Sequence, residues 1–362
     1  MRAQPSPHRS PRAAGASAPP SAERTGMFRE AAEAPAVVAR QLAENAALMD
    51  ELAARLRRSP PRAVITCARG SSDHASTFAR YLIETRLGAV TASAAPSVTS
   101  IYAAAPAMDG MLCLAISQSG RSPDLLAWAR AAAASGGTVV ALVNDEASPL
   151  AQLAELTLPL RAGPEVSVAA TKSYIASLSA LCQLVAAWSG DADLQAALDG
   201  LPALLDEAWA QPWDAAIEPL LTASGLYVIG RGLGFAIAQE AALKFKETCG
   251  LHAEAFSSAE MRHGPMALVG PGFPILAFAQ DDESRPGVEA ALESCVRQGA
   301  APMKAGGEAQ PGVTSLPSPR GHSTLQPLAF IQSFYRMASQ LAVARGFDPD
   351  RPPHLAKVTE TR

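Results

Sequence analysis

Residues 62–88 read RAVITCARGSSDHASTFARYLIETRLG, and this stretch holds the pattern that decides the fold. Val64–Cys67 is a short apolar run typical of a buried parallel strand. A loop rich in glycine and serine follows it, and then a helical stretch for which Gly88 is a suitable C-cap. The stretch therefore predicts one strand–loop–helix unit of an α/β fold.

The same plan returns later in the chain. Residues 226–250 read LYVIGRGLGFAIAQEAALKFKETCG, again a strand, an Arg-Gly loop, a helix and a closing glycine. Aligning Arg69 with Arg231 gives an offset of 162 residues (231 − 69), which also pairs Gly88 with Gly250. One further landmark fits this offset, namely Gly110 with Gly272. Three matched landmarks predict two similar α/β units in tandem.

Between the two stretches, expected strands alternate with expected helices. The strands are at 111–116, 138–143 and 155–160, and the helices are at 123–136 and 171–188. Such alternation predicts a doubly wound parallel sheet that is covered on both faces. In sheets of this kind, ligands bind at the carboxyl ends of the strands.

The length of 362 residues suggests about two domains. We expect a disordered extension at 1–26, an N-terminal helical segment at 27–60, a first α/β domain at 61–195, a second at 205–350 and a C-terminal tail at 351–362. The extension is rich in Pro, Ser, Ala and Arg and cannot bury enough apolar surface to order itself. Residues 296–325 predict strands least clearly, because Pro302 stands where a strand is expected.

Composition and charge argue against several classes of protein. A net charge of -4 and a pI near 5.9 do not suit a dedicated binder of nucleic acid or of anionic membranes. No apolar run reaches the roughly 18 residues that span a bilayer. The five cysteines are scattered and form no C-x-x-C pair, so neither a zinc site nor a disulfide framework is expected. They suit a reducing cytoplasm, which is the expected location.

Residues 230–234, GRGLG, resemble part of a dinucleotide-binding fingerprint. They lack the full G-x-G-x-x-G pattern, and no acidic residue follows in the right context. We therefore expect no nicotinamide or flavin, and no other cofactor or metal.

A candidate phosphate site follows the strand that ends near Ile116. Residues 115–126 read AISQSGRSPDLL, in which Ser122 is a good N-cap and Pro123 suits the first helical position. The free amides at such a helix start bind anions. Further hydroxyls come from the same loop and from the loop after the first strand: Ser117, Ser119, Ser71 and Ser72. These serines could instead only cap helices and turn loops.

The second unit provides a comparison for this site. At the same offset Ser117 becomes Ala279, Ser119 becomes Asp281 and Ser71 becomes Leu233. The second unit has thus lost hydroxyls and gained a carboxylate that would repel phosphate. We expect one phosphate site per chain, in the first unit.

Residues 246–265, KETCGLHAEAFSSAEMRHGP, are unusually rich in acidic and basic side chains. The helix expected from about 235 to 248 carries Glu240, Lys244 and Glu247 on one face. Two interpretations remain open. Glu240 and Lys244 could be an ordinary surface i,i+4 pair, or the face could supply acid–base groups to a reaction.

Several motifs taken together resemble the SIS (sugar isomerase) family. They are CARGSS, SQSGRSPDLL, GPEVSVAATKSY, GRGLG with EAALKFKE, HAEAFSSAEMRHGPMALV and HLAKVTE. Within the family they are most similar to the isomerase half of glucosamine-6-phosphate synthase and to SIS-type glucosamine-6-phosphate deaminases. The resemblance covers nearly all of residues 45–362. It implies two tandem doubly wound SIS domains, with an N-terminal helix and a C-terminal tail.

The resemblance also implies roles for particular residues. Six would hold the phosphate and the sugar hydroxyls: Ser71, Ser72, Ser117, Gln118, Ser119 and Ser122. Backbone groups near Val168 and Ala170 would border the sugar. Catalytic roles would fall to Glu247, which moves a proton between C2 and C1, to Lys244 beside it, to His263, which assists ring opening, and to the tail residue Lys357, which can form an imine with the open-chain ketose. Without the resemblance, Lys357 reads as a solvated tail residue.

His263 is expected to reach the neighbouring subunit's site, which implies a homodimer acting on a small-molecule sugar phosphate. No glutaminase segment with its nucleophilic cysteine is recognised, so we expect the deaminating direction, from glucosamine 6-phosphate to fructose 6-phosphate and ammonia. The alternatives are a simple aldose–ketose isomerase, a glutaminase-less aminotransferase-like protein and a non-enzymatic sugar-phosphate sensor. A sensor has no use for Glu247, His263 and Lys357 together.

Overall fold

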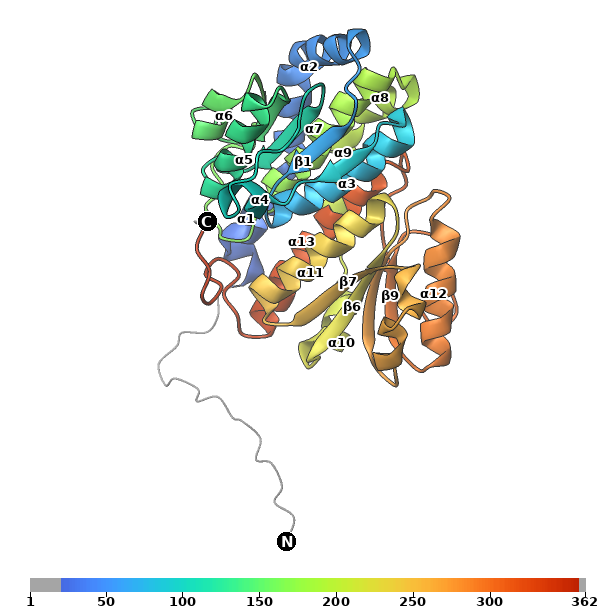
Figure 1. The fold of residues 1–362 in the computed structure, drawn as a ribbon. Helices are drawn as coiled ribbons and strands as arrows, with labels where there is room; N and C mark the ends of the chain where they lie inside the picture. Colours follow the sequence, from blue (N-terminus) through green and yellow to red (C-terminus); the bar gives the residue numbers. More distant parts are fainter. Residues whose placement is uncertain (1–20, 358–362) are drawn as a thin grey trace.

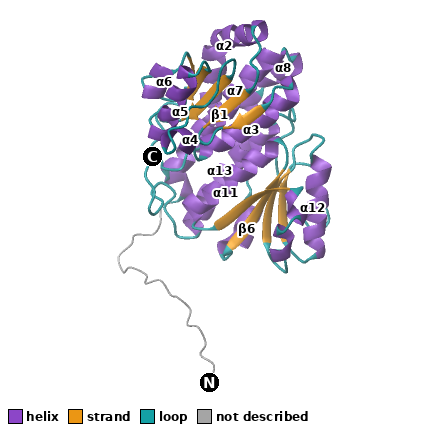
Figure 2. Ribbon diagram, viewed as in Figure 1, coloured by secondary structure: helices purple, strands orange, loops and turns teal. Residues whose placement is uncertain are grey.

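The computed structural model describes residues 21–357 and contains two five-stranded sheets in which all strands are parallel. Figure 2 shows the two groups of strands with helices between them. The first sheet has the order β2-β1-β3-β4-β5. Its strands are β1 (Val64–Cys67), β2 (Thr91–Ser93), β3 (Leu112–Ser117), β4 (Thr138–Val143) and β5 (Leu156–Pro159).

The second sheet, read from β7, has the order β7-β6-β8-β9-β10, which repeats the order of the first. Its strands are β6 (Gly225–Gly230), β7 (His252–Ser257), β8 (Pro274–Phe278), β9 (Ala301–Ala305) and β10 (Thr314–Leu316). This strand order is one of the common doubly wound arrangements. The prediction of two tandem doubly wound α/β units is confirmed.

The offset of 162 residues holds in the structure. Helix α3 (Ser71–Leu87) becomes α11 (Leu233–Cys249) when both of its ends are shifted by this amount. Gly88 and Gly250 close the two helices with left-handed φ angles of 65° and 57°. Glycine is favoured there because a side chain disfavours that conformation. The repeat is therefore structural, and it places equivalent loops at the carboxyl ends of β1 and β6.

The remaining helices cover and separate the sheets. They are η1 (Ala22–Arg24), α1 (Gly26–Ala32), α2 (Ala34–Arg58), α4 (Pro96–Ser100), α5 (Pro123–Ala134), α6 (Pro149–Leu153), α7 (Lys172–Ser189), α8 (Ala192–Asp199), α9 (Leu201–Ala210), η2 (Asp214–Ala216), α10 (Ile217–Leu221), η3 (Glu260–Arg262), η4 (Pro265–Leu268), α12 (Arg285–Arg297) and α13 (Gln326–Ala344). Figure 1 shows α11 and α13 between the two sheets. The largest cluster of buried apolar residues draws on both units, so they share one core.

Residues 296–325 do form strands, although their sequence predicts them poorly. β9 contains Pro302 and lies between β8 and β10. Ala301 donates its backbone N–H to Phe273 on the β8 side, so the next residue faces the other side. Pairing with β10 begins only at Met303. Pro302 thus stands where no backbone donor is needed, which is why a proline is tolerated in an interior strand.

The chain ends differ in part from expectation. Residues 1–20 of the expected disordered extension, and 358–362 of the tail, lie outside the described residues. Residues 21–26 do not fit the prediction of disorder, because they form η1 and the first residue of α1. Within 21–357, no helix is both long and apolar enough to cross a membrane.

All five cysteines are buried and free. Burial raises the pKa of the Cys113 thiol to about 11. It raises the pKa of the Cys249 thiol to about 12, against a small opposing effect of the hydrogen bond with Thr248. These thiols are poor nucleophiles at neutral pH.

Candidate active site

A cavity of about 300 Å³ opens at the carboxyl ends of β1 and β3. Its lining includes all eight residues expected to bind substrate, namely Ser71, Ser72, Ser117, Gln118, Ser119, Ser122, Val168 and Ala170. Lys357 of the tail lines it as well. The fold thus brings together side chains from four separate segments of the chain, at the sheet edge where doubly wound proteins bind ligands.

Local geometry explains why this loop can receive an anion. Ser122 occupies the N-cap position of α5, and Pro123 follows at the first helical position. The Ser122 hydroxyl makes no capping hydrogen bond, so it is free to contact a ligand together with the amides of the first turn. Ser117 serves the loop itself, since its Oγ accepts from the Gly120 amide at 3.0 Å. Turn formation, one of the two functions expected of these serines, is thus seen at Ser117, and the Ser122 hydroxyl is left available to a ligand.

One basic side chain of the cavity was not singled out from the sequence. Arg69 donates from Nε and Nη2 to the Oδ2 atom of Asp124, at 2.8 and 2.7 Å. The Asp124 side chain is 1% exposed, whereas that of Arg69 is 49% exposed and lines the cavity. Asp124 lies in the first turn of α5, where it suits the helix dipole but would repel a phosphate. Arg69 neutralises that charge and leaves other N–H groups available.

Lys357 reaches the cavity through contacts with the loop before α7. Its Nζ donates to the carbonyl oxygen of Ser167 at 2.6 Å and lies 3.3 Å from Oε2 of Glu165. Glu165 is buried, and it also accepts from the Thr171 and Ser173 amides at 3.0 and 3.1 Å. Lys357 is therefore an ordered residue of the cavity wall, and the interpretation as a solvated tail residue does not hold.

The charged face of α11 is not a surface face. Glu240 and Lys244 are 0% and 1% exposed, so the interpretation as a surface i,i+4 pair is wrong. Lys244 Nζ contacts the carboxylate of Glu247 and lies 3.5 Å from Oε1 of Glu240. Periodicity alone misleads here because α3 of the first unit covers this face of the helix.

Neighbouring charges keep this buried pair ionised. Burial alone would raise the pKa of Glu240, but the Lys244 charge and the hydrogen bond with His74 outweigh it and hold that pKa below its usual value. Burial alone would lower the pKa of Lys244, but the carboxylates of Glu240 and Glu247 raise it above its usual value. The charges of Glu240 and Lys244 thus depend on each other.

Ser71 connects the cavity with the charged residues of α11. Its Oγ donates to Oε1 of Glu240 at 3.0 Å, while it also lines the cavity. Two more residues hold Glu240: His74 Nδ1 at 2.8 Å and the Tyr335 hydroxyl at 3.1 Å. Ser71 therefore has the cavity on one side and the charged residues of the second unit on the other.

His263 does not join the cavity of its own chain. It follows η3, is exposed, and is absent from the cavity lining. Glu247 and Lys244 are likewise not part of that lining. The expectation that His263 acts on a neighbouring subunit is untested by a single chain.

The equivalent loop of the second unit is filled by its own side chains. Gln280, at the same offset from Gln118, donates from Nε2 to the Arg231 carbonyl oxygen and to Ser284 Oγ, both at 2.8 Å. A Cβ added at Gly234 would lie 2.4 Å from Gln280 Oε1, so Gln280 packs directly on the helix start. This packing agrees with the expectation of a single phosphate site.

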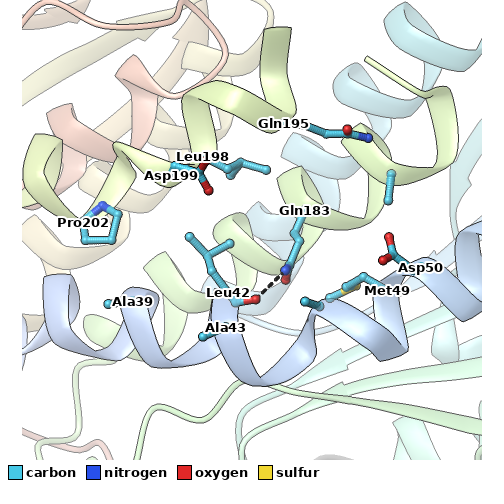
Figure 3. Close-up of a pocket in the computed structure, with 12 residues that line it drawn as sticks. Ala39, Leu42, Ala43, Met49, Asp50, Gln183, Gln195, Leu198, Asp199 and Pro202 are labelled. Carbon is cyan, nitrogen blue, oxygen red and sulfur yellow. Dashed lines mark hydrogen bonds between the residues drawn. The ribbon is translucent and has the colours of Figure 1, made fainter. Parts of the chain in front are cut away.

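A larger cavity of about 520 Å³ lies elsewhere, between α2, α7, α8 and α9 (Figure 3). Its lining is largely alanine, leucine and methionine, and Gln183 Nε2 donates across it to the Leu42 carbonyl oxygen at 2.8 Å. It contains none of the candidate residues and no paired acid and base. Within the described residues, no group of three or more His, Cys, Asp or Glu side chains is placed to hold a metal ion.

Four residues were not predicted from the sequence in the roles that they have at this site. They are Arg69, His74, Glu165 and Glu240 as a buried group. Arg69 served only as an alignment landmark, although a cation beside a serine loop is itself a signal for phosphate. Glu165 stands within the quoted motif GPEVSVAATKSY, but no spacing rule separates it from a solvated loop residue.

Comparison with known proteins agrees with this geometry. The sequence profile of the SIS domain family matches residues 58–187 and 220–303. A glutamine–fructose-6-phosphate aminotransferase (isomerizing) from Aeropyrum pernix is 35% identical over 94% of this chain. The chain spans 58% of that relative's length, and 50% of a similarly named relative from Methanothermobacter thermautotrophicus.

Two solved structures extend the comparison. A candidate phosphosugar isomerase from Silicibacter pomeroyi is 43% identical, with a TM-score of 0.86 over 90% of this chain and 100% of that one. The C-terminal domain of a glucosamine–fructose-6-phosphate aminotransferase from Francisella tularensis is 25% identical, with a TM-score of 0.82 over 91% of this chain and 98% of that one. With two matched segments, two equivalent sheets and one serine-lined cavity, this chain belongs to the SIS domain family.

Proposed function

We propose that this chain is an amino sugar phosphate deaminase that converts glucosamine 6-phosphate to fructose 6-phosphate and ammonia. The single observation that carries the proposal is Ser71, which lines the serine cavity and donates to Glu240 beside Lys244 and Glu247. Ser71 thus links the phosphate cradle to a set of acid–base groups.

The names of the relatives support a sugar phosphate as the ligand. The curated relatives are described as aminotransferases acting with fructose 6-phosphate, and the 43% identical structure as a candidate phosphosugar isomerase. From an amino sugar phosphate, the reaction needs only water as a further reactant. Deamination is therefore a complete reaction that the residues of this chain can serve.

In the proposed reaction the phosphate binds at the start of α5, with Ser117, Ser119 and Ser122 and the Arg69 guanidinium around it. A proton shuttle at the anomeric hydroxyl opens the ring, and histidine suits this step because it titrates near neutral pH. His263 of a second subunit performs it. The active unit is then a homodimer.

Glu247 next takes the proton from C2 of the open aldose and returns it to C1, while a proton passes from the C2 ammonium group to the C1 oxygen; a protonated imine at C2 results. Water adds to this carbon, ammonia departs, and the C2 ketone remains. Lys244 holds the Glu247 carboxylate in place for both transfers. The Lys357 amine lines the cavity, where it can condense with the C2 carbonyl of the ketose.

Replacement of Glu247 tests the proposal. Glu247→Gln should reduce ammonia release from glucosamine 6-phosphate by roughly 100-fold or more, as for loss of an acid–base catalyst. Binding of glucosamine 6-phosphate, measured by isothermal titration calorimetry, should change little, because the serine cradle that holds the phosphate stays intact. Glu254→Gln, on the exposed side of β7, is the matched control and should keep full activity. Full activity in Glu247→Gln would overturn the role of this base.

A second candidate is aldose–ketose isomerisation of a sugar phosphate without an amino group. The 43% identical structure favours it, since its description names an isomerase. It uses the same cavity and the same base but releases no ammonia. A panel of hexose and hexosamine 6-phosphates, followed by parallel ketose and ammonia assays, separates the two reactions.

A further inference from the structure

The C-terminal tail is fastened to the cavity at two points. After α13 the chain runs back toward α1, and Figure 1 shows the last described part of the chain, in red, beside that helix. Lys357 donates to the Ser167 carbonyl oxygen at 2.6 Å and thereby joins the cavity wall. Asp350, seven residues earlier, also contacts Ser167, because the Ser167 hydroxyl donates to its Oδ1 at 3.1 Å. One loop residue therefore holds the tail on both sides of the segment that leads to Lys357.

Asp350 is in turn held by the start of α1. The backbone amides of Gly26 and Met27 donate to its two carboxylate oxygens at 2.6 and 2.7 Å. The approach is close, since a Cβ on Gly26 would lie 2.8 Å from Ser167 Oγ and 3.2 Å from Asp350 Oδ1. Hydrogen bonds from amides to a carboxylate are charge-assisted and stronger than neutral ones.

A third contact closes the arrangement. Glu30 of α1 is buried, and its Oε1 accepts from the amides of Val166 and Ser167 at 2.5 and 3.3 Å. Helix α1, the tail and the loop before α7 therefore hold one another. Val168 of that loop lines the cavity, so the arrangement bears directly on the cavity wall.

We propose that Asp350 is a positioning residue, which clasps the tail to α1 and Ser167 so that Lys357 is held in the cavity. The catalytic role of Lys357 rests on the proposed function, in which its amine condenses with the ketose. The clasp that Asp350 makes between the tail, α1 and Ser167 does not depend on that function. Without the carboxylate, the tail loses its hydrogen bonds to the start of α1 and to the Ser167 hydroxyl, and the lysine becomes more mobile.

The first test traps Lys357 chemically. When the amine adds to the C2 carbonyl of fructose 6-phosphate, water leaves, and hydride from borohydride reduces the resulting imine to a stable amine that mass spectrometry detects on Lys357. Asp350→Ala should trap roughly tenfold less than the unaltered protein, the loss expected for a charge-assisted hydrogen bond. Its kcat should fall while KM changes little, because the serine cradle is intact. Glu308→Ala, an exposed carboxylate, is the control and should behave as the unaltered protein.

The second test needs no activity. The rate at which acetic anhydride labels Lys357 in the ligand-free protein, read by peptide mass spectrometry, should rise several-fold in Asp350→Ala and stay unchanged in Glu308→Ala. If the unaltered protein traps no ketose, the catalytic role of Lys357 fails, and the labelling rate still decides the geometry. Equal labelling in Asp350→Ala and the unaltered protein would overturn the clasp. Should Asp350→Ala not fold, Ser167→Ala removes only the shared hydroxyl and must show the same acceleration to a smaller degree.

Discussion

Arg69 neutralises the negative charge that Asp124 would otherwise present to a ligand in the cavity. Its guanidinium is the partner of the buried Asp124 carboxylate, which lies at the helix start where a phosphate would bind. Without Arg69, the negative charge of Asp124 would face the ligand unscreened. The counterpart of Asp124 in the second unit, at the offset of 162, is Pro286, so Arg231 there has no such carboxylate.

Because of this difference, we expect the same substitution to have different effects at Arg69 and at Arg231. Arg69→Met should weaken binding of glucosamine 6-phosphate by roughly 10- to 100-fold, the loss of a hydrogen bond to a charged group. Arg231→Met, at the equivalent position of the second unit, should leave the affinity unchanged. Calorimetric titration of both variants checks this. An affinity in Arg69→Met equal to that of the unaltered protein would remove Arg69 from the phosphate site.

The stability of helix α11 depends on the pairing of two buried charges, those of Glu240 and Lys244. Lys244→Met should lower the free energy of unfolding by about 3–5 kcal/mol, because Glu240 is then left buried without its main counter-charge. Lys246→Met, two residues along on the exposed side, should change it by less than about 0.5 kcal/mol. Urea denaturation of the two variants measures the difference.

The same pair predicts how this loss depends on pH. In the unaltered protein the lowered pKa of Glu240 contributes stability above the unfolded-state pKa, and this stability is lost as pH falls through the folded value. In Lys244→Met the charge that lowers this pKa most is absent, so the folded-state pKa of Glu240 rises. The variant then binds a proton more readily when folded, and its deficit should shrink as pH is lowered from 7 toward 5. A deficit independent of pH would show that lost packing dominates.

Helices and strands could be predicted from the sequence where the patterns that specify them are local. The closing glycines of α3 and α11 and the alternation of strands and helices follow from apolar runs, caps and the repeat. β9 was poorly predicted because tolerance of Pro302 depends on where β10 begins to pair. Glu240 was misjudged because periodicity finds a polar face but cannot tell whether another domain covers it. The serine cradle was foreseen, whereas Arg69 and Glu165 act through partners distant in sequence.

Across the whole molecule, the two α/β units differ in the side chains that they place at equivalent positions. The first keeps an open helix start with free hydroxyls, while Gln280 fills the equivalent place in the second. The second contributes Glu240, Lys244 and Glu247, and the tail contributes Lys357. The two units thus keep the same strand order but place different side chains at their equivalent loops. His263, Lys244 and Glu247 are not part of the lining of the serine cavity.

Complementation between two inactive variants tests the shared site that we propose. In His263→Ala the subunit keeps Glu247, and in Glu247→Gln it keeps His263. If each site takes His263 from the partner, a mixed dimer restores one of its two sites and leaves the other with both defects. With a twofold-symmetric dimer and random mixing in equal amounts, about a quarter of the unaltered activity should return. If His263 acted within its own chain, every site would retain one defect, and co-refolding or co-expression of the two variants would restore no ammonia release.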